Sequence, residues 1–331
     1  MRSQRAFGIA ISVFLAAAML APGDQAPQAL STNRASILTI AVQGQIAPAQ
    51  PSRGYIVTWD GRPKLAVGTG GINYNLRLGD KVFGWASGDR ATVGVAAEAV
   101  SDSRSGGEAW LAHASIGNEV RITGGEASGE RGFVVGKFGG YVLLQFPEAT
   151  VDKLSVGDRL QAKASGLGLE IDGFKDVFVH SLAPDLLEKL GLRIAGDKLE
   201  VPVVKKIPAE IVGQGSGGGA LYGNWHIQTC FPPDVGTYGL DELRFGDLVL
   251  LEDTQTDYGR GYYQGGATVG VVSSGPSDQS GLGIGVTAIL STRFGKLAGR
   301  LDPEANVGKY LGLPLSNRGS ALPAAPAAPA A

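Results

Sequence analysis

The chain has only one cysteine among its 331 residues, Cys230, so an intramolecular disulfide is excluded. In an oxidising compartment a lone thiol is a liability unless it is buried. The surrounding letters, TCFPP, are apolar and turn-forming. They favour a buried structural thiol over a reactive nucleophile.

An excess of positive charge is also missing, because 29 lysines and arginines stand against 31 aspartates and glutamates, for a net charge of −2. Without a basic stripe, the chain lacks the field that neutralises nucleic-acid phosphates. We therefore expect no nucleic-acid partner and, instead, a small-molecule ligand.

Histidine is rare, and short catalytic motifs are missing. The three histidines are His113, His180 and His226, which are too scattered to predict a zinc site with three histidine ligands. The sequence contains no Gly-x-Ser-x-Gly elbow, no His-Glu-x-x-His and no Walker loop. A candidate site must therefore be found from other patterns.

Glycine, in contrast, is abundant, with 51 residues, about twice the usual share of roughly 7%. Glycine destabilises helices and is favoured at turns and bulges. With apolar runs such as FVVGKFGGYVLLQF, this composition predicts a mostly β (β-rich α+β) fold of small-barrel or sandwich units. The length allows two such domains.

The first residues are typical of a secretory signal peptide over residues 1–21. Arg2 and Arg5 precede an apolar stretch at residues 7–15 and three alanines at residues 16–18. The apolar stretch is shorter than the about 20 residues of a membrane span, so we expect cleavage and no span in the mature protein. The protein is therefore predicted to be exported from a bacterium, to the periplasm or the medium.

Low-complexity residues flank the folded part of the chain. Residues 22–35 are predicted to be a disordered spacer, and the Pro/Ala-rich residues 315–331 a disordered tail. Between them, PDLLEKLGL predicts a helix with Pro184 in its first turn. A boundary at this helix gives an N-terminal β domain at 36–182 and a C-terminal β domain at 183–314.

Residues 120–146 show the order strand, Gly-rich turn, Gly-x-Val strand, turn, strand. This order is similar to the KOW-type motif of SH3-like barrels, in which Gly132 would let two strands cross closely. The basic residues that such barrels use on RNA are sparse here, namely Arg121, Arg131 and Lys137. We interpret the segment as scaffold.

An internal repeat links the two predicted domains. LRLGDKV (76–82) precedes ATVGV (91–95), and LRFGDLV (243–249) precedes a second ATVGV (267–271); a shorter echo, LSVGDRL, begins at Leu154. Gly-Asp before an apolar strand is a common turn, but two ordered motifs that recur together predict a duplicated β-unit. Only the second copy carries a long insertion, LLEDTQTDYGRGYYQGG, and an unshared polar loop is the better site candidate.

Three oxygen-bearing residues alternate in this insertion, namely Asp253, Gln255 and Asp257. In an extended segment they point to one face, and hard cations prefer such oxygen ligands. We predict that these residues bind a divalent metal ion as cofactor. The alternative is a solvated hairpin loop in which aspartate is a turn residue.

The same insertion offers side chains for a substrate. Arg260 can bind a carboxylate through its planar guanidinium group, or it can pair with Asp257. Tyr258 and Tyr262, with Tyr263, would supply stacking surface for the ligand.

Proton transfer is assigned to His226 or Glu210, with a structural histidine as the alternative for His226. The Gly-rich residues 208–223 are either a lid over a cleft or a linker. The glycine-containing turns at 68–75 and 115–119 are of a kind that can present backbone N–H groups to a ligand, although most such turns do not.

Several motifs occur in one order along the chain, including LAVGTGGINYN, SIGNEV, IPAEIVGQG, LRFGDLV and YGRGYYQGGATVGVV. In this order they resemble the bacterial and archaeal family known as domain of unknown function 4438, over most of residues 36–314. The resemblance implies a β-rich, two-part protein whose biochemistry is unassigned.

Two functions are consistent with these residues. The first is an exported hydrolase of a small amide or ester, in which a metal on Asp253 and Asp257 lowers the pKa of a bound water. His226 or Glu210 would move the proton, and Arg260 would orient the substrate. The alternative is a non-catalytic periplasmic module that binds a small ligand; a structural β-protein is the third possibility.

Overall fold

The computed structural model describes most of the chain, namely residues 30–50, 55–65, 68–86, 88–100, 104–213, 219 and 224–319. The predicted signal peptide, residues 22–29 of the predicted spacer and residues 320–331 of the predicted tail lie outside them. Within the described ranges, no helix has the length and hydropathy needed to cross a membrane.

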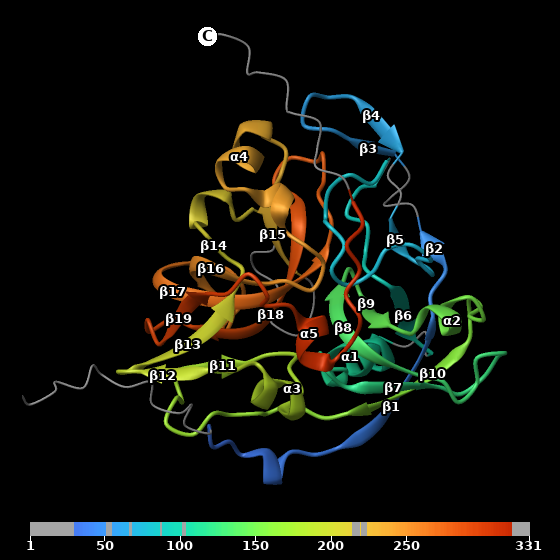
Figure 1. Cartoon of the computed structure of the whole chain (residues 1–331), viewed down its shortest axis with the longest axis horizontal. Helices are drawn as coiled ribbons and strands as arrows, with labels where there is room; N and C mark the ends of the chain where they lie inside the picture. The colour runs from blue at the N-terminus through green and yellow to red at the C-terminus, as the bar shows by residue number, and fades with distance from the viewer. Residues whose placement is uncertain are drawn as a thin grey trace, which may run out of the picture.

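The chain is mostly β, as predicted, and its first large element is a closed barrel of six strands in the order β1-β10-β7-β8-β9-β6. The strand bounds are Ile40–Ile46 (β1), Val95–Ala99 (β6), Glu119–Ile122 (β7), Arg131–Phe138 (β8), Tyr141–Gln145 (β9) and Arg159–Ala164 (β10). In Figure 1 the barrel occupies the right side of the molecule and a larger sheet the left.

Side-chain alternation fills the barrel. Along β10, Leu160, Ala162 and Ala164 are buried and the residues between them are exposed, as expected for a strand with one face in the core. The predicted SH3-like segment supplies β7, β8 and β9 of this barrel. A Cβ at Gly132 would lie 2.5 Å from the carbonyl oxygen of Gln145, so the close crossing expected there is present.

The second large element is a sheet of six strands in the order β11-β18-β17-β16-β14, with β15 also paired to β18. The bounds are Phe178–Val179 (β11), Lys205–Ile207 (β14), Trp225–Gln228 (β15), Leu248–Gln255 (β16), Gly261–Ser274 (β17) and Gly283–Thr292 (β18). Strand β18 is buried along its whole length. The sheet meets the barrel at Gly136 of β8, where a Cβ would lie 2.8 Å from the Cβ of Ser273.

Shorter elements complete the fold. A three-stranded sheet has the order β12-β13-β19 (Arg193–Ala195, Lys198–Val203, Leu297–Leu301), and two ribbons are β2 with β5 (Ala49–Gln50, Thr69–Gly70) and β3 with β4 (Tyr55–Val57, Pro63–Leu65). The helices are α1 (Arg104–His113), α2 (Glu148–Val151), α3 (Pro184–Lys189), α4 (Pro232–Thr237) and α5 (Val307–Leu311), with 3-10 turns at Arg34–Ser36, Ala209–Ile211 and Leu240–Glu242. Pro184 opens α3, as PDLLEKLGL predicts.

The Gly-Asp motif forms the same turn in all three places where it recurs. In each turn the aspartate carboxylate accepts a hydrogen bond of 2.8 Å from the backbone N–H three residues earlier. The preceding glycines, Gly79, Gly157 and Gly246, have φ values of +90°, +90° and +88°. Glycine adopts this conformation without steric strain, which explains why the pair Gly-Asp recurs.

The Gly-Asp turns of the two repeat copies, at Gly79 and Gly246, also pair with each other. The N–H of Gly79 donates to the carbonyl of Phe245, and the N–H of Phe245 donates to the carbonyl of Asp80, both at 2.9 Å. The likeness of the two copies does not extend to the strands that follow. After the turn at Gly246, β16 and β17 form a long hairpin. After the turn at Gly79, the described residues of 81–94 contain isolated β-bridges and no named strand.

The N-terminal end of the described chain contacts the folded body. Thr32 forms a bridge with Ile171, and Arg34 forms an ion pair with Asp185 of α3. Residues 30–35, predicted as the end of a disordered spacer, are therefore attached to the protein.

The C-terminal end behaves in the same way. The N–H of Ser316 donates to the carbonyl of Leu78 at 2.8 Å, and the N–H of Arg318 donates to the carboxylate of Asp80 at 2.7 Å. Residues 315–319 of the predicted tail thus lie against the first Gly-Asp turn.

A lysine is buried where the barrel meets the sheet. Lys137 of β8 is only 2% exposed. Its ammonium group donates hydrogen bonds to Ser181 Oγ at 2.8 Å and to the carbonyl of Leu111 in α1. Burial lowers the pKa of Lys137 to about 7. Lys137 is therefore an internal group and not one of the sparse surface cations.

This burial predicts an unusual dependence of stability on pH. A lysine in an unfolded chain has a pKa of about 10.4, so between about pH 7 and pH 10 the unfolded state binds more protons and stability rises with pH. In Lys137→Met this contribution disappears. The difference in unfolding free energy between variant and parent should therefore move in favour of the parent by on the order of 1 kcal/mol per pH unit above pH 7.

Urea unfolding of parent and variant at about pH 7, 8 and 9 measures this difference. Lys175→Met makes the same change at an exposed lysine and should follow the parent at each pH. A difference between Lys137→Met and the parent that is constant with pH would contradict the prediction.

Candidate functional site

The three predicted metal ligands have separate hydrogen-bond partners. Asp253 lies in a bulge of β16 with a φ of +51°, and its carboxylate accepts a hydrogen bond of 2.7 Å from the N–H of Gly265. Gln255 donates to the carbonyl of Gly259, and the side chain of Asp257 is buried. Among the described residues, no three histidine, cysteine, aspartate or glutamate side chains form a group that could hold a metal ion. The metal site stays a prediction.

Asp257 belongs to a buried cluster with His180 and Ser291. Ser291 Oγ donates to Asp257 Oδ1 and lies 2.9 Å from His180 Nε2, and Oδ1 is 3.5 Å from the same nitrogen. A catalytic triad needs the carboxylate on the opposite ring nitrogen, Nδ1. Ser291 is also fully buried, so this cluster attaches the insertion to β18 and does not present a nucleophile.

Two of the predicted stacking tyrosines, Tyr258 and Tyr262, lie at exposed positions. Tyr258 is 65% exposed; its ring meets the ring of Phe178 edge-on at 5.8 Å and lies 5.3 Å from the guanidinium carbon of Arg293. Tyr262 is 68% exposed. The two tyrosines thus belong to an exposed aromatic end of the β16–β17 hairpin.

The two predicted proton-transfer residues also have different surroundings. Glu210 accepts a hydrogen bond of 2.9 Å from the Tyr238 hydroxyl at an exposed position. His226 of β15 is only 8% exposed, and its Nδ1 lies 3.2 Å from the carbonyl oxygen of Gly283. Because a carbonyl can only accept, Nδ1 of the neutral ring carries the proton and Nε2 is left as an acceptor.

Two arginines place positive charge near His226. Burial lowers the pKa of His226 to about 4; the carbonyl of Gly283 opposes this shift, and the charges of Arg90 and Arg260 add to it. Arg260 donates a hydrogen bond of 3.3 Å to the carbonyl of Gly219, and burial lowers the pKa of its guanidinium group. The structure therefore brings together His226 and Arg260, both of which were selected from the sequence.

Arg90 is the member of this group that sequence reasoning missed. Its φ is +54°, and its N–H donates a hydrogen bond of 2.7 Å to the carbonyl of Pro276. Its guanidinium carbon lies 5.8 Å from the centre of the Phe138 ring, and that ring meets His226 edge-on at 6.1 Å. A non-glycine residue held at positive φ is a form of strain that clusters at functional sites. We call Arg90, Phe138, His226 and Arg260 the arginine–histidine site.

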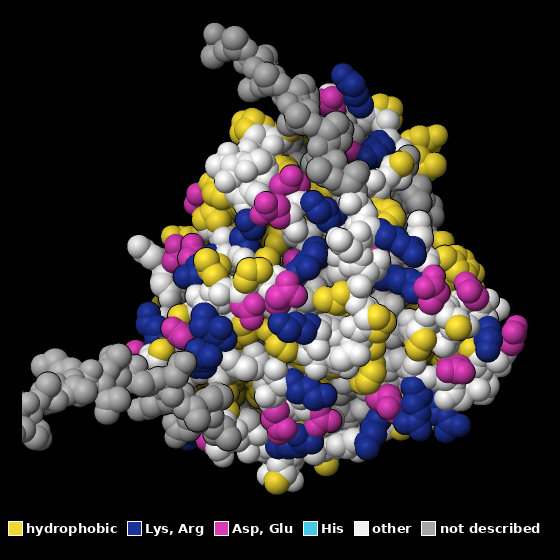
Figure 2. Space-filling view, viewed as in Figure 1, with side chains coloured by type: hydrophobic (Ala, Val, Ile, Leu, Met, Phe, Trp, Pro, Cys, Tyr) yellow, Lys and Arg dark blue, Asp and Glu magenta, His cyan; other side chains and the backbone are white. Residues whose placement is uncertain are grey.

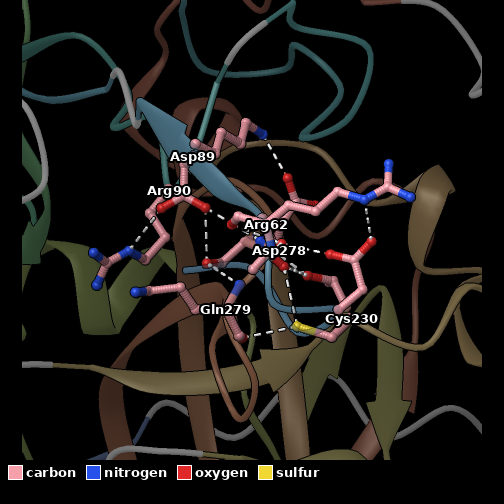
Figure 3. Close-up of polar contacts among 11 residues, drawn as sticks. Arg62, Asp89, Arg90, Cys230, Asp278 and Gln279 are labelled. Atoms are coloured by element: carbon pink, nitrogen blue, oxygen red, sulfur yellow. Dashed lines mark hydrogen bonds and ion pairs between the residues drawn. The ribbon is translucent and has the colours of Figure 1, made fainter. Parts of the chain in front are cut away.

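A buried carboxylate holds Arg90 in place (Figure 3). Asp89 is fully buried; its Oδ1 accepts hydrogen bonds from Ser277 Oγ at 2.8 Å and from the N–H of Asp278 at 3.2 Å. Its Oδ2 lies 3.4 Å from Arg90 Nε. Asp278 in turn forms an ion pair with Lys64 of β4. The loop after β17 therefore fixes both the backbone and the charge of Arg90.

Cys230 lies at another part of this network, beside Gln279 in Figure 3. Its Sγ donates to the carbonyl of Gln279 at 2.8 Å. Burial, with smaller contributions from Asp278 and Asp89, raises the pKa of the half-buried thiol to about 11. A protonated thiol is a poor nucleophile, so these contacts favour the structural role.

A glycine opposite His226 makes room for the aromatic face of the site. His226 of β15 pairs with Gly285 of β18. A Cβ at Gly285 would lie 2.2 Å from Ser274 Oγ and 3.2 Å from the Phe138 ring. A glycine at this position therefore leaves room for Ser274 and for the Phe138 ring, which contacts Arg90 and meets His226 edge-on.

The arginine–histidine site suits an anion. Guanidinium groups bind carboxylates and phosphates through charge-assisted hydrogen bonds, and Phe138 adds an apolar surface. A bound anion would add a negative charge near the two guanidinium groups, of which Arg90 is already paired with Asp89, and would raise the pKa of His226. On the outer face shown in Figure 2, by contrast, lysines and arginines are intermixed with acids and no histidine is visible.

Two family models and a solved structure are similar to this chain. Residues 55–188 match the N-terminal model of the domain of unknown function DUF4438, and residues 189–311 match its C-terminal model. The structure described as "Crystal structure of TM1086" has 35% sequence identity and a TM-score of 0.80, over 86% of this chain and 99% of that chain. No curated protein matches.

Proposed function

We propose that this chain, which belongs to the DUF4438 family of unknown function, binds a small anionic molecule at the arginine–histidine site. The observation that carries the proposal is the placement of two arginine charges beside a buried, neutral histidine. A guanidinium group carries five N–H donors, so Arg90, although paired with Asp89, and Arg260 can both contribute charge-assisted hydrogen bonds to an anion.

The proposal corresponds to the ligand-binding module predicted from the sequence, with a different set of residues. Arg260 and His226 are retained from the sequence prediction, and Arg90 and Phe138 are added. The predicted metal-assisted hydrolase would need Asp253 and Asp257 on one cation, and in this structure those carboxylates have different partners. We therefore do not propose hydrolysis.

Export is part of the proposal. Arg2 and Arg5 with the apolar residues after them support a cleaved signal peptide, so the ligand would be met in the periplasm or outside the cell. The ligand would be a small carboxylate, inorganic phosphate or sulfate, or an organic ester of phosphate or sulfate.

Calorimetric titration with sodium sulfate and with malate tests the site. We expect saturable binding by the parent and a loss of at least about ten-fold in sulfate affinity in Arg260→Gln, because a charge-assisted hydrogen bond contributes roughly 1.5–3 kcal/mol. Sulfate keeps its charge between about pH 5 and pH 7.5. Because an anion raises the pKa of His226 in the complex, sulfate should bind more tightly at pH 5, and His226→Gln should lose this pH dependence.

The matched control is Arg62→Gln, which removes a guanidinium group that is 83% exposed and paired with Asp60. It should bind sulfate like the parent. Absence of saturable binding of both anions by the parent, or an equal loss in Arg62→Gln and Arg260→Gln, would refute the proposal.

A further inference from the structure

A cavity lies between the N-terminal segment, the first turn of α3 and the ends of β7, β8 and β10. We call it the α3 cavity. Its volume is about 430 Å³, within the roughly 300–1,000 Å³ of small-molecule sites. None of its lining residues belongs to the arginine–histidine site.

The floor of the α3 cavity is the SIGNE turn, one of the two turns that sequence analysis considered for ligand binding. Asn118 is 4% exposed, and its Oδ1 accepts hydrogen bonds from the N–H groups of Ser115 at 2.9 Å and Ser165 at 3.3 Å. Its Nδ2 donates to the carbonyl of Ser165 at 2.9 Å. Gly117 has a φ of +95°. Because the Asn118 side chain and these backbone groups form hydrogen bonds with one another, the turn keeps this conformation without a ligand.

The walls of the cavity carry more positive than negative charge. Arg131 pairs with Glu119 at 2.7 Å, and Arg34 pairs with Asp185. Lys163 of β10 is the third lining cation, and its side chain makes no hydrogen bond or ion pair with any residue that the structure describes. The lining residues are three cations and two acids, and Arg34 also pairs with Glu188 of α3 at 2.6 Å, so both arginines are paired and Lys163 is the lining cation without an ion pair among the described residues.

The remaining lining groups include apolar ones. Ile37 comes from the N-terminal segment, Phe133 from β8, and Pro184 from the start of α3. Each arginine keeps N–H donors in addition to those used in its ion pair, since a guanidinium group has five. The cavity therefore combines a free ammonium group, spare donors and an apolar wall.

We propose that the α3 cavity is a second ligand site, which takes a small organic acid with its carboxylate on Lys163 and its apolar part against Ile37 and Phe133. The α3 cavity is independent of the arginine–histidine site, since the two sites share no residue. Placement of Arg34 and Ile37 in its wall also gives a role to residues at the end of the predicted spacer and just after it.

The test uses benzoate and benzamide, which have the same shape and differ in charge, with NMR detection on the Ile37 methyl group and on the His226 ring. Benzoate should shift the Ile37 methyl resonance saturably. Benzamide, and benzoate with Lys163→Met, should bind at least about ten-fold more weakly. Methionine keeps the length of the aliphatic chain and removes only the charge.

Two controls separate this site from the first one. Lys175→Met changes an exposed lysine that does not line the cavity, and Arg260→Gln weakens only the arginine–histidine site; both should leave the Ile37 response as in the parent. The proposal is overturned if benzoate leaves the Ile37 methyl unshifted, if benzamide binds as well as benzoate, or if Lys163→Met binds benzoate like the parent.

Discussion

Replacement of Asp89 by alanine should lower the free energy of unfolding by about 3 kcal/mol and weaken sulfate binding at the arginine–histidine site. The stability loss follows from the contacts of the carboxylate, which is fully buried and accepts from Ser277 Oγ and the N–H of Asp278. Each buried donor left without an acceptor costs roughly 1–3 kcal/mol. The binding loss follows because Asp89 is also the carboxylate beside Arg90 Nε.

Urea unfolding and sulfate calorimetry on the same preparations measure the two effects. Asp60→Ala is the control, because Asp60 is an aspartate of the neighbouring β3–β4 turn whose partner Arg62 is largely exposed. Exposed ion pairs contribute about 0–1 kcal/mol, so this variant should stay close to the parent in both assays. An Asp89→Ala protein as stable as Asp60→Ala, with sulfate binding intact, would show that Asp89 does not hold Arg90.

Gly283→Ala should destabilise the protein by about 3 kcal/mol or more, since overpacking against backbone cannot be relieved by a side-chain rotation. A Cβ at Gly283 would lie 1.8 Å from the carbonyl oxygen of Ile227 and 3.0 Å from the N–H nitrogen of Thr229. Strand β15 must therefore separate from β18 at this point. The carbonyl of Gly283, which lies 3.2 Å from His226 Nδ1, would shift with it.

Thermal unfolding compares Gly283→Ala with Gly236→Ala, two substitutions whose expected changes in stability have opposite signs. A Cβ at Gly236 of α4 meets nothing within 4 Å, and alanine favours a helix by roughly 1 kcal/mol, so this variant should be as stable as the parent or more so. In Gly283→Ala we also expect weaker sulfate binding. Equal melting temperatures for the two variants would mean that β15 adapts to the added methyl group.

Much of the fold could be predicted from the sequence because its determinants are local. The Gly-Asp turns depend on a carboxylate and an N–H only three residues apart, and Gly132 stands between apolar strands that are continuous in sequence. The order of the strands in the sheets could not be predicted from the sequence in the same way. The barrel closes through β1 and β10, which are far apart in the chain, and no short-range pattern specifies such a pairing.

The candidate site was predicted only in part, for the same reason. His226 and Arg260 stand out because histidine is rare and the insertion is unshared. Arg90, in FGWASGDR, looks like an ordinary turn residue; its importance depends on Pro276 and Phe138, which are distant in sequence. The Gly-Asp-Arg letters within the first copy of the repeat were the one available signal.

Lys137 shows a second limit of sequence reasoning. A lysine in a strand is usually exposed, so from its residue type Lys137 is expected to be one of the sparse basic residues on the barrel surface. Burial becomes evident only when β17 and β18 are seen to cover β8, through Ser273 and Thr287.

The Gly-Asp turns at Gly79 and Gly246 pair with each other, and this pairing has a consequence for how the halves of the chain fold. Gly79 lies within the N-terminal family domain and Phe245 within the C-terminal one, yet each supplies the hydrogen-bond partner that the other turn requires. A half produced alone would expose these backbone groups and the surface around Leu78, which is fully buried in the whole chain. The family boundary therefore does not separate two independent sets of backbone hydrogen-bond partners, and we expect the two halves to complete their folding together.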